Sequence, residues 1–249
     1  MTPFNAICLA GALLLAMTTA ASAQQPSATA PPPPATLSPA ATSTAPSAPQ
    51  PGIEPDAVAI LKAMSDKLAA AKTISFNAVS TYESPAVNGQ RLYYTTVSQV
   101  TVERPDKLRV MTPGDGPPTE FYYNGKTMVA YDPAMNLVAI TDAPPTIDAM
   151  VKAAYDKAAI YFPFVDFIVA DPYKDMEGSL KSAFLVGRSD VVVGTLTDMV
   201  AIAGDNVQAE LWIGVNDKLP RMMRAVYPKD PNKSRYETEF SKLASQWSG

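Results

Sequence analysis

Histidine is absent from the 249-residue chain, and the single cysteine, Cys8, lies near the N-terminus. Without an imidazole, the chain cannot hold a Ser-His-Asp or Cys-His catalytic set, nor a zinc ion bound by histidine. It also has no glycine-rich phosphate loop, and no pair of carboxylates has the context of a general acid and base. We therefore predict no catalytic residue, no bound metal and no cofactor, in a protein that is not an enzyme.

Charged side chains are missing from the whole stretch before Glu54, and all 20 Lys and Arg and all 24 Asp and Glu occur from that position onward. The chain thus consists of two physically different parts. The formal net charge of −4 at pH 7 provides no basic field. A nucleic-acid partner is therefore not expected.

The uncharged part opens with an apolar run over residues 7–17, which is too short to span a bilayer stably. The small residues Ala21-Ser22-Ala23 follow in the pattern of a cleavage site. We predict a signal peptide over residues 1–23, cleaved after Ala23, and a periplasmic location. Cys8 would leave with the signal, so no disulfide is expected. Because the first five residues contain no Lys or Arg, an uncleaved N-terminal anchor is the alternative.

Residues 24–53 are rich in Pro, Ala, Ser and Thr, and include four consecutive prolines at 31–34. Such a segment cannot bury enough apolar surface to fold, and it samples polyproline II. We predict a disordered tether with an extended reach of roughly 90 Å, at about 3.1 Å per residue. It is either a spacer within the cell envelope or a tail without a role of its own.

The remaining residues, 54–249, are enough for one sizeable hydrophobic core. Apolar residues at helical spacing predict an N-terminal helix from Pro55 to about Leu68 and a second helix over 147–159. Thr146 is the expected N-cap of the second helix. Runs of β-forming residues between turn signals predict strands at 74–82, 92–102, 108–111, 121–123, 127–131, 137–141, 183–186, 191–197, 200–203, 207–215, 221–227 and 236–243.

The segments 191–197 and 200–203 are either two strands or one interrupted strand, which gives about 11 strands in all. The order of helix, six strands, helical insert and further strands predicts an α+β domain. We expect a single curved antiparallel sheet that forms a half-open β-barrel, with the insert as a helical lid over its opening.

Three groups of residues carry a resemblance to a known family: Arg104-Pro105 at the end of a long strand, the hairpin residues 123–127, and Tyr131-Asp132-Pro133. In this order they resemble the periplasmic lipoprotein carriers LolA and LolB. The later segments 208–213 and 219–221 are closer to a family of predicted periplasmic proteins, domain of unknown function twenty ninety-two, which we expect to share the carrier fold.

The resemblance implies a half-open barrel with a helical lid, whose cavity holds acyl chains in the carriers. It also implies that Arg104 hydrogen-bonds the lid and latches it closed. The alternative is a surface arginine at a strand end. At the position where the second family often carries a cysteine and a histidine, this chain has Thr197-Asp198-Met199, so no thiol or imidazole chemistry carries over.

The most hydrophobic stretch after the leader is residues 160–169. Ten residues are too few for a membrane span, so this stretch must pack on an apolar surface. It either lines a ligand cavity or forms ordinary core. The candidate ligand-binding residues in and near it are Phe162, Phe164, Phe167, Ile168 and Met150. Asp166, in the same stretch, either points to solvent or caps the short helix that is expected near Pro163.

These observations predict an exported envelope protein that binds or carries a hydrophobic ligand, namely a lipid or an acylated protein, beneath the lid. Peripheral contact with a membrane is compatible with this function. The alternative is a structural or protein-interaction module whose interior is filled by its own side chains.

The mature protein is expected to begin at Gln24, because the small residues at 21–23 follow the apolar run directly. N-terminal sequencing of the exported protein tests this expectation. A first residue of Met1 in that material would contradict it.

Overall fold

The structure, a computed structural model, describes residues 52–114, 117–192, 194–231 and 234–247, with side chains up to Ala244. The predicted signal peptide and the predicted tether up to residue 51 lie outside the described residues, so both remain predictions.

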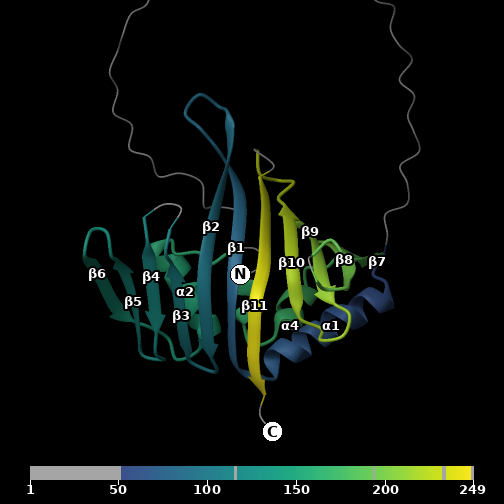
Figure 1. Cartoon of the computed structure of the whole chain (residues 1–249), viewed down its shortest axis with the longest axis horizontal. Coiled ribbons are helices and arrows are strands. Elements are labelled where there is room, and N and C mark those ends of the chain that lie inside the picture. Colours follow the sequence, from purple (N-terminus) through teal and green to yellow (C-terminus); the bar gives the residue numbers. More distant parts are fainter. Residues whose placement is uncertain (1–51, 115–116, 193, 232–233, 248–249) are drawn as a thin grey trace, which may run out of the picture. The chain divides into compact units, whose positions relative to one another are not determined.

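Eleven strands form one antiparallel sheet within the described residues (Figure 1). Their spatial order is β6-β5-β4-β3-β2-β1-β11-β10-β9-β8-β7, so β6 and β7 are the two edges and the sheet does not close into a barrel. The strands are β1 (Ala71–Pro85), β2 (Arg91–Glu103), β3 (Lys107–Thr112), β4 (Thr119–Tyr123), β5 (Thr127–Asp132), β6 (Leu137–Asp142), β7 (Ser182–Ser189), β8 (Thr197–Ala203), β9 (Gln208–Gly214), β10 (Pro220–Val226) and β11 (Arg235–Trp247). The predicted fold class and strand number are confirmed.

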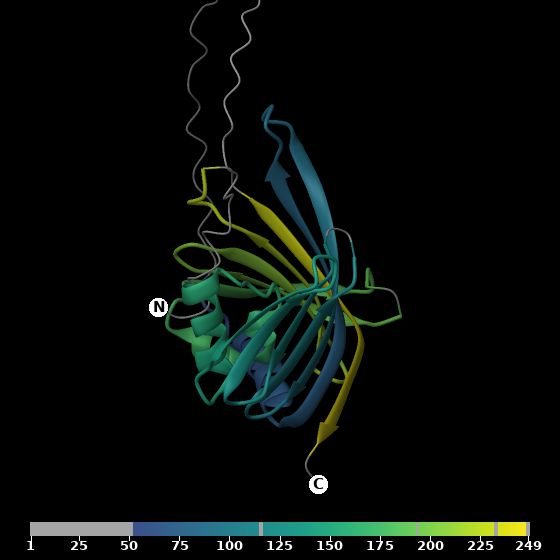
Figure 2. The ribbon, with the colours of Figure 1, turned by 90° about the vertical axis from the view of Figure 1, so that its left-hand side faces the viewer.

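The sheet consists of two meanders that meet at its centre. Strands β1 to β6 follow one another outward on one side, and β7 to β11 return inward on the other. Strand β11 then pairs antiparallel with β1, so that Tyr236 lies opposite Tyr82. This pairing joins the first strand of the domain to the last, and Figure 2 shows the resulting curvature.

Four helices within the described part of the chain lie against the concave face of the sheet (Figures 1 and 2). They are α1 (Pro55–Ala69), α2 (Ile147–Ala158), α3 (Val165–Ile168) and α4 (Pro172–Glu177). The hydroxyl of Thr146 accepts a hydrogen bond from the Ala149 N–H, as predicted for an N-cap. The sequence analysis missed α4, which Asp171 caps and in which Pro172 occupies the first turn.

The core lies between the helices and the concave face. On β1 alternate residues are buried, among them Ile74, Phe76 and Ala78, as expected for a strand with one covered face. Helix α1 contributes Leu61 and Met64, which are both fully buried. One continuous cluster of buried apolar residues therefore connects the lid, α1 and both halves of the sheet.

The strand predicted over 191–197 does not form, which corrects the sequence analysis. Strand β7 ends at Ser189 and pairs directly with β8, with Ser189 opposite Thr197. The described residues between them belong to the connecting loop. Val192 in this loop is buried against Trp212 and Met222 on the convex face, so its apolar character comes from a loop contact and not from a strand.

The described end of the predicted tether pairs with edge strand β7. Ile53 forms a parallel bridge with Ala183, and the Glu54 N–H donates to the Ala183 carbonyl at 2.8 Å. The Glu54 carboxylate accepts from the Leu185 N–H at 3.0 Å. These contacts begin at Gly52, two residues before the predicted start of the domain, and partly cover an edge that would otherwise expose unpaired backbone groups.

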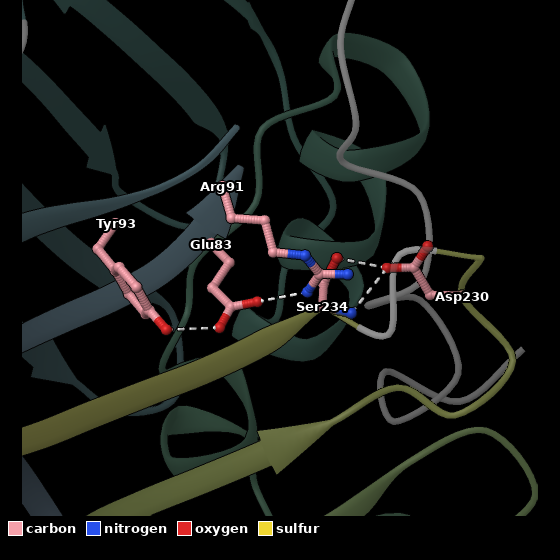
Figure 3. A network of polar contacts seen from close by, with 5 residues as sticks. All are labelled: Glu83, Arg91, Tyr93, Asp230 and Ser234. Atoms are coloured by element: carbon pink, nitrogen blue, oxygen red, sulfur yellow. Dashed lines mark hydrogen bonds and ion pairs between the residues drawn. The ribbon is translucent and has the colours of Figure 1, made fainter. Parts of the chain in front are cut away.

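Polar contacts fix the far end of the long β1–β2 hairpin (Figure 3). Glu83 accepts hydrogen bonds from Arg91 at 2.8 Å and from the Tyr93 hydroxyl at 2.9 Å. Beside them, Asp230 accepts from the backbone N–H of Ser234 at 3.1 Å, in the connection between β10 and β11. The two polar groups lie at the same end of the sheet.

We expect Phe164→Ala to destabilise the domain by about 3–5 kcal/mol, because a buried phenyl ring leaves a cavity when it is removed. Phe164 is fully buried. Urea unfolding measures the change. Val87→Ala on the exposed hairpin tip is the control and should alter stability by less than about 0.5 kcal/mol. Equal effects of the two substitutions would show that Phe164 does not hold the lid on the sheet.

Candidate ligand-binding site

The lid, defined here as residues 144–178, is attached to the sheet by backbone and side-chain hydrogen bonds around its first half. The Tyr123 hydroxyl donates to the Pro144 carbonyl at 2.6 Å. The Ile147 N–H donates to the Pro105 carbonyl at 3.3 Å. These contacts anchor the start of α2 to the turn between β2 and β3 and to the end of β4.

Arg104 reaches the second half of the lid from the turn after β2. Its Nη2 donates to the carbonyl of Val169, which follows α3, at 2.9 Å. Asp148 of α2 accepts from the Ala170 N–H at 3.0 Å, next to this contact. Burial lowers the pKa of the Arg104 guanidinium, and the nearby Asp148 carboxylate opposes that shift. The contact is the one a latch requires, and the latch role itself remains a prediction.

All five predicted ligand-binding residues are buried between lid and sheet. The Phe162 ring meets Phe121 of β4 at a centroid distance of 5.0 Å. Phe164 and Phe167 meet sheet residues Phe76 and Phe240 at 5.5 Å and 4.7 Å. Met150 and Ile168 are fully buried in the same core. In this conformation the five side chains pack against other residues of the core. That they bind a ligand remains a prediction.

An apolar cavity of about 20 Å³ lies between the lid and strands β8 to β10. This volume has room for about one water molecule. The lining residues are Asp166, Phe167, Met176, Ile202, Val207, Ala209, Leu211, Met223, Ala225 and Tyr227. Of the five predicted residues only Phe167 reaches it. The strands predicted at 207–215 and 221–227 contain several of the lining residues, and their alternating apolar side chains indicated a covered face. Nothing in the sequence indicated that the lid covers these strands in particular.

A larger hollow of about 330 Å³ lies along β2 to β5. Its lining includes the charged side chains of Glu103, Lys107 and Arg109, all of which are exposed. An apolar ligand would gain little burial there, so the cavity beneath the lid is the better candidate.

Four side chains that carry ionisable groups influence one another electrostatically, and two of them, Asp166 and Tyr227, line the cavity. We call Tyr161, Asp166, Tyr227 and Tyr236 the polar cluster. Burial is the largest cause of the strongly raised pKa of Tyr161, and the other three members raise it further. Burial likewise raises the pKa of Tyr236, and the neighbouring Ser80 and Thr238 hydroxyls oppose that shift. The four residues come from the lid, the end of β10 and β11, and only the fold brings them together.

Asp166 neither caps α3 nor lies fully in solvent. The N-cap position of α3 is Phe164, without a side-chain cap, so the expected capping role is wrong. Asp166 keeps part of its surface accessible. Protein atoms nevertheless surround its carboxyl, and this burial raises its pKa to about 7, with a smaller contribution from Asp175.

Comparison with known protein families identifies the family of this chain. The sequence profile of the family described as "Predicted periplasmic protein (DUF2092)" matches residues 57–248. The chain belongs to this family. The family recognised from the sequence is thereby confirmed, and this DUF2092 member has the single open antiparallel sheet described above.

Solved structures with a similar fold share little sequence with this DUF2092 chain. MucB is 15% identical, with 79% of this chain and 61% of MucB covered and a TM-score of 0.47. LprF from Mycobacterium bovis is 16% identical, with 79% and 97% covered and a TM-score of 0.46. The LolA superfamily protein NE2245 from Nitrosomonas europaea is 8% identical, with 78% and 94% covered and a TM-score of 0.35.

The DUF2092 chain spans about three fifths of the length of MucB. No curated protein matches it. No helix in the described residues is long and apolar enough to cross a membrane. Within that same part of the chain, no three His, Cys, Asp or Glu side chains form a group that could hold a metal ion.

Arg104→Leu is expected to loosen the lid, because the Val169 carbonyl loses its donor, at a cost of about 1–3 kcal/mol for a buried group. Hydrogen exchange should become faster in residues 144–169. Arg109→Leu on exposed β3 is the matched control and should leave exchange in the lid unchanged. If the two variants exchange alike in the lid, Arg104 is not a latch.

Asp166→Asn is expected to change how stability depends on pH. The folded pKa of about 7 lies above the ordinary value of 3.8, so the unfolded protein releases this proton at lower pH. The free energy of unfolding of the wild type should therefore fall as pH rises from about 4 to 7, by up to roughly 4 kcal/mol at about 1.4 kcal/mol per pH unit.

The Asp166→Asn variant should lack this fall and should be the more stable protein at pH 8. Urea unfolding between pH 4 and 8 measures the difference, and Asp142→Asn on the exposed edge strand β6 is the control. Identical pH profiles for the wild type and Asp166→Asn would contradict a buried carboxyl.

Proposed function

We propose that this domain binds an apolar ligand, a lipid chain or the acyl group of a protein, between the lid and strands β8 to β10. The observation that carries the proposal is the apolar cavity beneath the lid. Its walls are side chains of two lid helices and three strands, so movement of the lid would enlarge it. Burial of an acyl chain there would contribute about 25 cal/mol per Å² of apolar surface removed from water.

Entry of such a ligand requires the lid to move, because the cavity has room for about one water molecule. The polar contacts of the lid with the described sheet are concentrated at α2 and at Val169. An opening motion could therefore break the Arg104 contact and separate α3 and α4 from β8 to β10 while α2 stays anchored. This gating would be a binding step, and we propose no chemical reaction for the domain.

The proposal includes the location and the domain organisation. Export through a signal peptide cleaved after Ala23 would deliver the domain to the periplasm, which agrees with the description of its family. A tether up to residue 53, with residues 54–249 as the half-barrel domain, would let the domain move between partners in the envelope. The partner class is a lipid or an acylated protein, and peripheral contact with a membrane would allow transfer.

A second candidate function follows from the packing of the lid. Phe162 and Phe164 contact each other at 5.8 Å and each contacts the sheet, so part of the interior is already filled. A domain whose interior stays filled would act as a structural or protein-interaction module. The two functions differ in whether an apolar ligand can displace the lid.

A fluorescent acyl probe should bind the purified protein and be displaced by phospholipid, and native mass spectrometry should detect lipid that copurifies. Ala209→Leu fills the cavity without adding charge and should weaken probe binding at least tenfold. Phe164→Asp should abolish binding, because an unpaired carboxylate in an apolar site is strongly disfavoured. Val87→Asp on the exposed hairpin tip is the control for added charge. A folded wild type that binds no acyl probe would favour the interaction module.

A further inference from the structure

The two edges of the sheet differ in how far they are covered. At β7, Ile53 forms a parallel bridge with Ala183. The Glu54 carboxylate accepts from the Leu185 N–H at 3.0 Å at the same edge. At the other edge, β5 is the one described strand that pairs with β6, which forms the outer margin at the left of Figure 1. Strand β6 therefore presents a row of backbone groups that no described backbone group satisfies.

The side chains of β6 are unusual for an uncovered edge. All six residues are exposed, and the strand contains no lysine, arginine or proline. Leu137 and Val138 are each 56% exposed, and Ile140 is 66% exposed. Natural proteins usually protect an edge with charges, proline, a bulge or a covering segment, and the pairing of β6 with β5 contains no bulge. An apolar, uncovered edge of this kind is a surface for a further β-strand.

The hydrogen bonds to β5 determine which residues of β6 point their backbone groups outward. The Ala143 N–H, directly after β6, donates to the Lys126 carbonyl, directly before β5, at 2.8 Å. Hydrogen-bonded and non-hydrogen-bonded pairs alternate along an antiparallel ladder. The odd positions of β6 therefore bond to β5, and the outward donors and acceptors belong to Val138, Ile140 and Asp142.

We propose that β6 pairs antiparallel with β6 of a second copy of this chain, so that the two sheets join across a two-fold axis. Residues with outward backbone groups must face one another in such a pairing. This requirement is met when Val138 lies opposite Ile140 of the second copy, and Ile140 opposite Val138. The axis then passes through Ala139, which faces its own counterpart.

A second copy suits this edge because the strand is complementary to itself in that register. The two pairs of Val138 with Ile140 are apolar and β-branched, and such cross-strand pairs stabilise a sheet. Asp142, the one charged residue of β6, falls at the end of the pairing beside Asn136 of the second copy. The two carboxylates therefore do not lie opposite each other, which would be destabilising. The same surface serves both copies, as a two-fold interface requires.

The pairing leaves the candidate ligand site unchanged. The cavity lies beneath the lid at β8 to β10, in the other half of the sheet, so the inference does not rest on the proposed function. Six residues from each copy form a small interface, below about 1,200 Å². We therefore expect a reversible dimer whose population rises with protein concentration.

Sedimentation of the full-length protein over a range of concentrations measures the association. The wild type should convert from monomer to dimer as its concentration rises. Ile140→Lys should weaken dimerisation at least tenfold, because a lysine on an edge strand opposes strand pairing, and its binding of an acyl probe should equal that of the wild type. Val87→Lys on the exposed hairpin tip is the control and should leave the dimer unchanged.

Two results of this measurement would overturn the inference. The first is a wild type that stays monomeric up to about 1 mM, which would favour a strand of a different protein as the partner of β6. The second is an Ile140→Lys protein that dimerises as the wild type does, which would place the interface elsewhere on the molecule.

A single thiol tests the register. In a Cys8→Ser chain, Ala139→Cys supplies the only cysteine. The two copies of this residue should have Cα atoms about 4.5 Å apart, the spacing of a non-hydrogen-bonded pair, which a disulfide can bridge. Oxidised glutathione should therefore link the two chains covalently.

Thr141→Cys in the same chain is the matched control, since it lies on the same face of the same exposed strand. Its counterpart would be displaced by four positions along the pairing, roughly 13 Å at about 3.3 Å per residue, so this variant should stay unlinked. Equal cross-linking of the two variants, or a dimer in which Ala139→Cys does not cross-link, would contradict the proposed pairing.

Discussion

The antiparallel pairing of β11 with β1 is the contact on which the rest of the domain depends. It joins a meander that runs outward from β1 to a meander that runs inward to β11, and so makes one curved sheet of two halves. Because the helical insert lies between the two meanders in the sequence, this pairing places the insert across the concave face. Without it, the lid would have half a sheet to cover and Phe167 would lose Phe240, its partner on β11.

The lid both completes the hydrophobic core and covers a cavity. Its aromatic residues complete the core, since Phe162 and Phe164 pack on strands of the first meander and on each other. On the side of the second meander, α3 and α4 cover a small apolar cavity. This cavity, which lies on the side of the second meander, is the physical basis of the proposed binding function.

A carboxyl in an apolar lining makes the second half unusual. An interior that served only as packing would be more stable with an apolar side chain in place of Asp166, because burial disfavours its charged form. A carboxyl beside Tyr227 in the lining of an apolar cavity therefore reduces stability at pH values where it is ionised.

The sequence by itself determined the local structure and much of the architecture. Alternating apolar residues predicted the strands, the spacing of Leu61 and Met64 predicted α1, and the insert between two runs of strands predicted a lid. The strand predicted at 191–197 is wrong, because Trp212, which buries Val192, becomes its neighbour only in the folded sheet.

Tertiary structure also decided which residues meet at the candidate site. Asp166 and Tyr227 line the same cavity although they are 61 positions apart in the chain, and no periodicity or motif links them. Their proximity follows from the β1–β11 pairing and from lid packing, which are long-range contacts that local propensity does not encode.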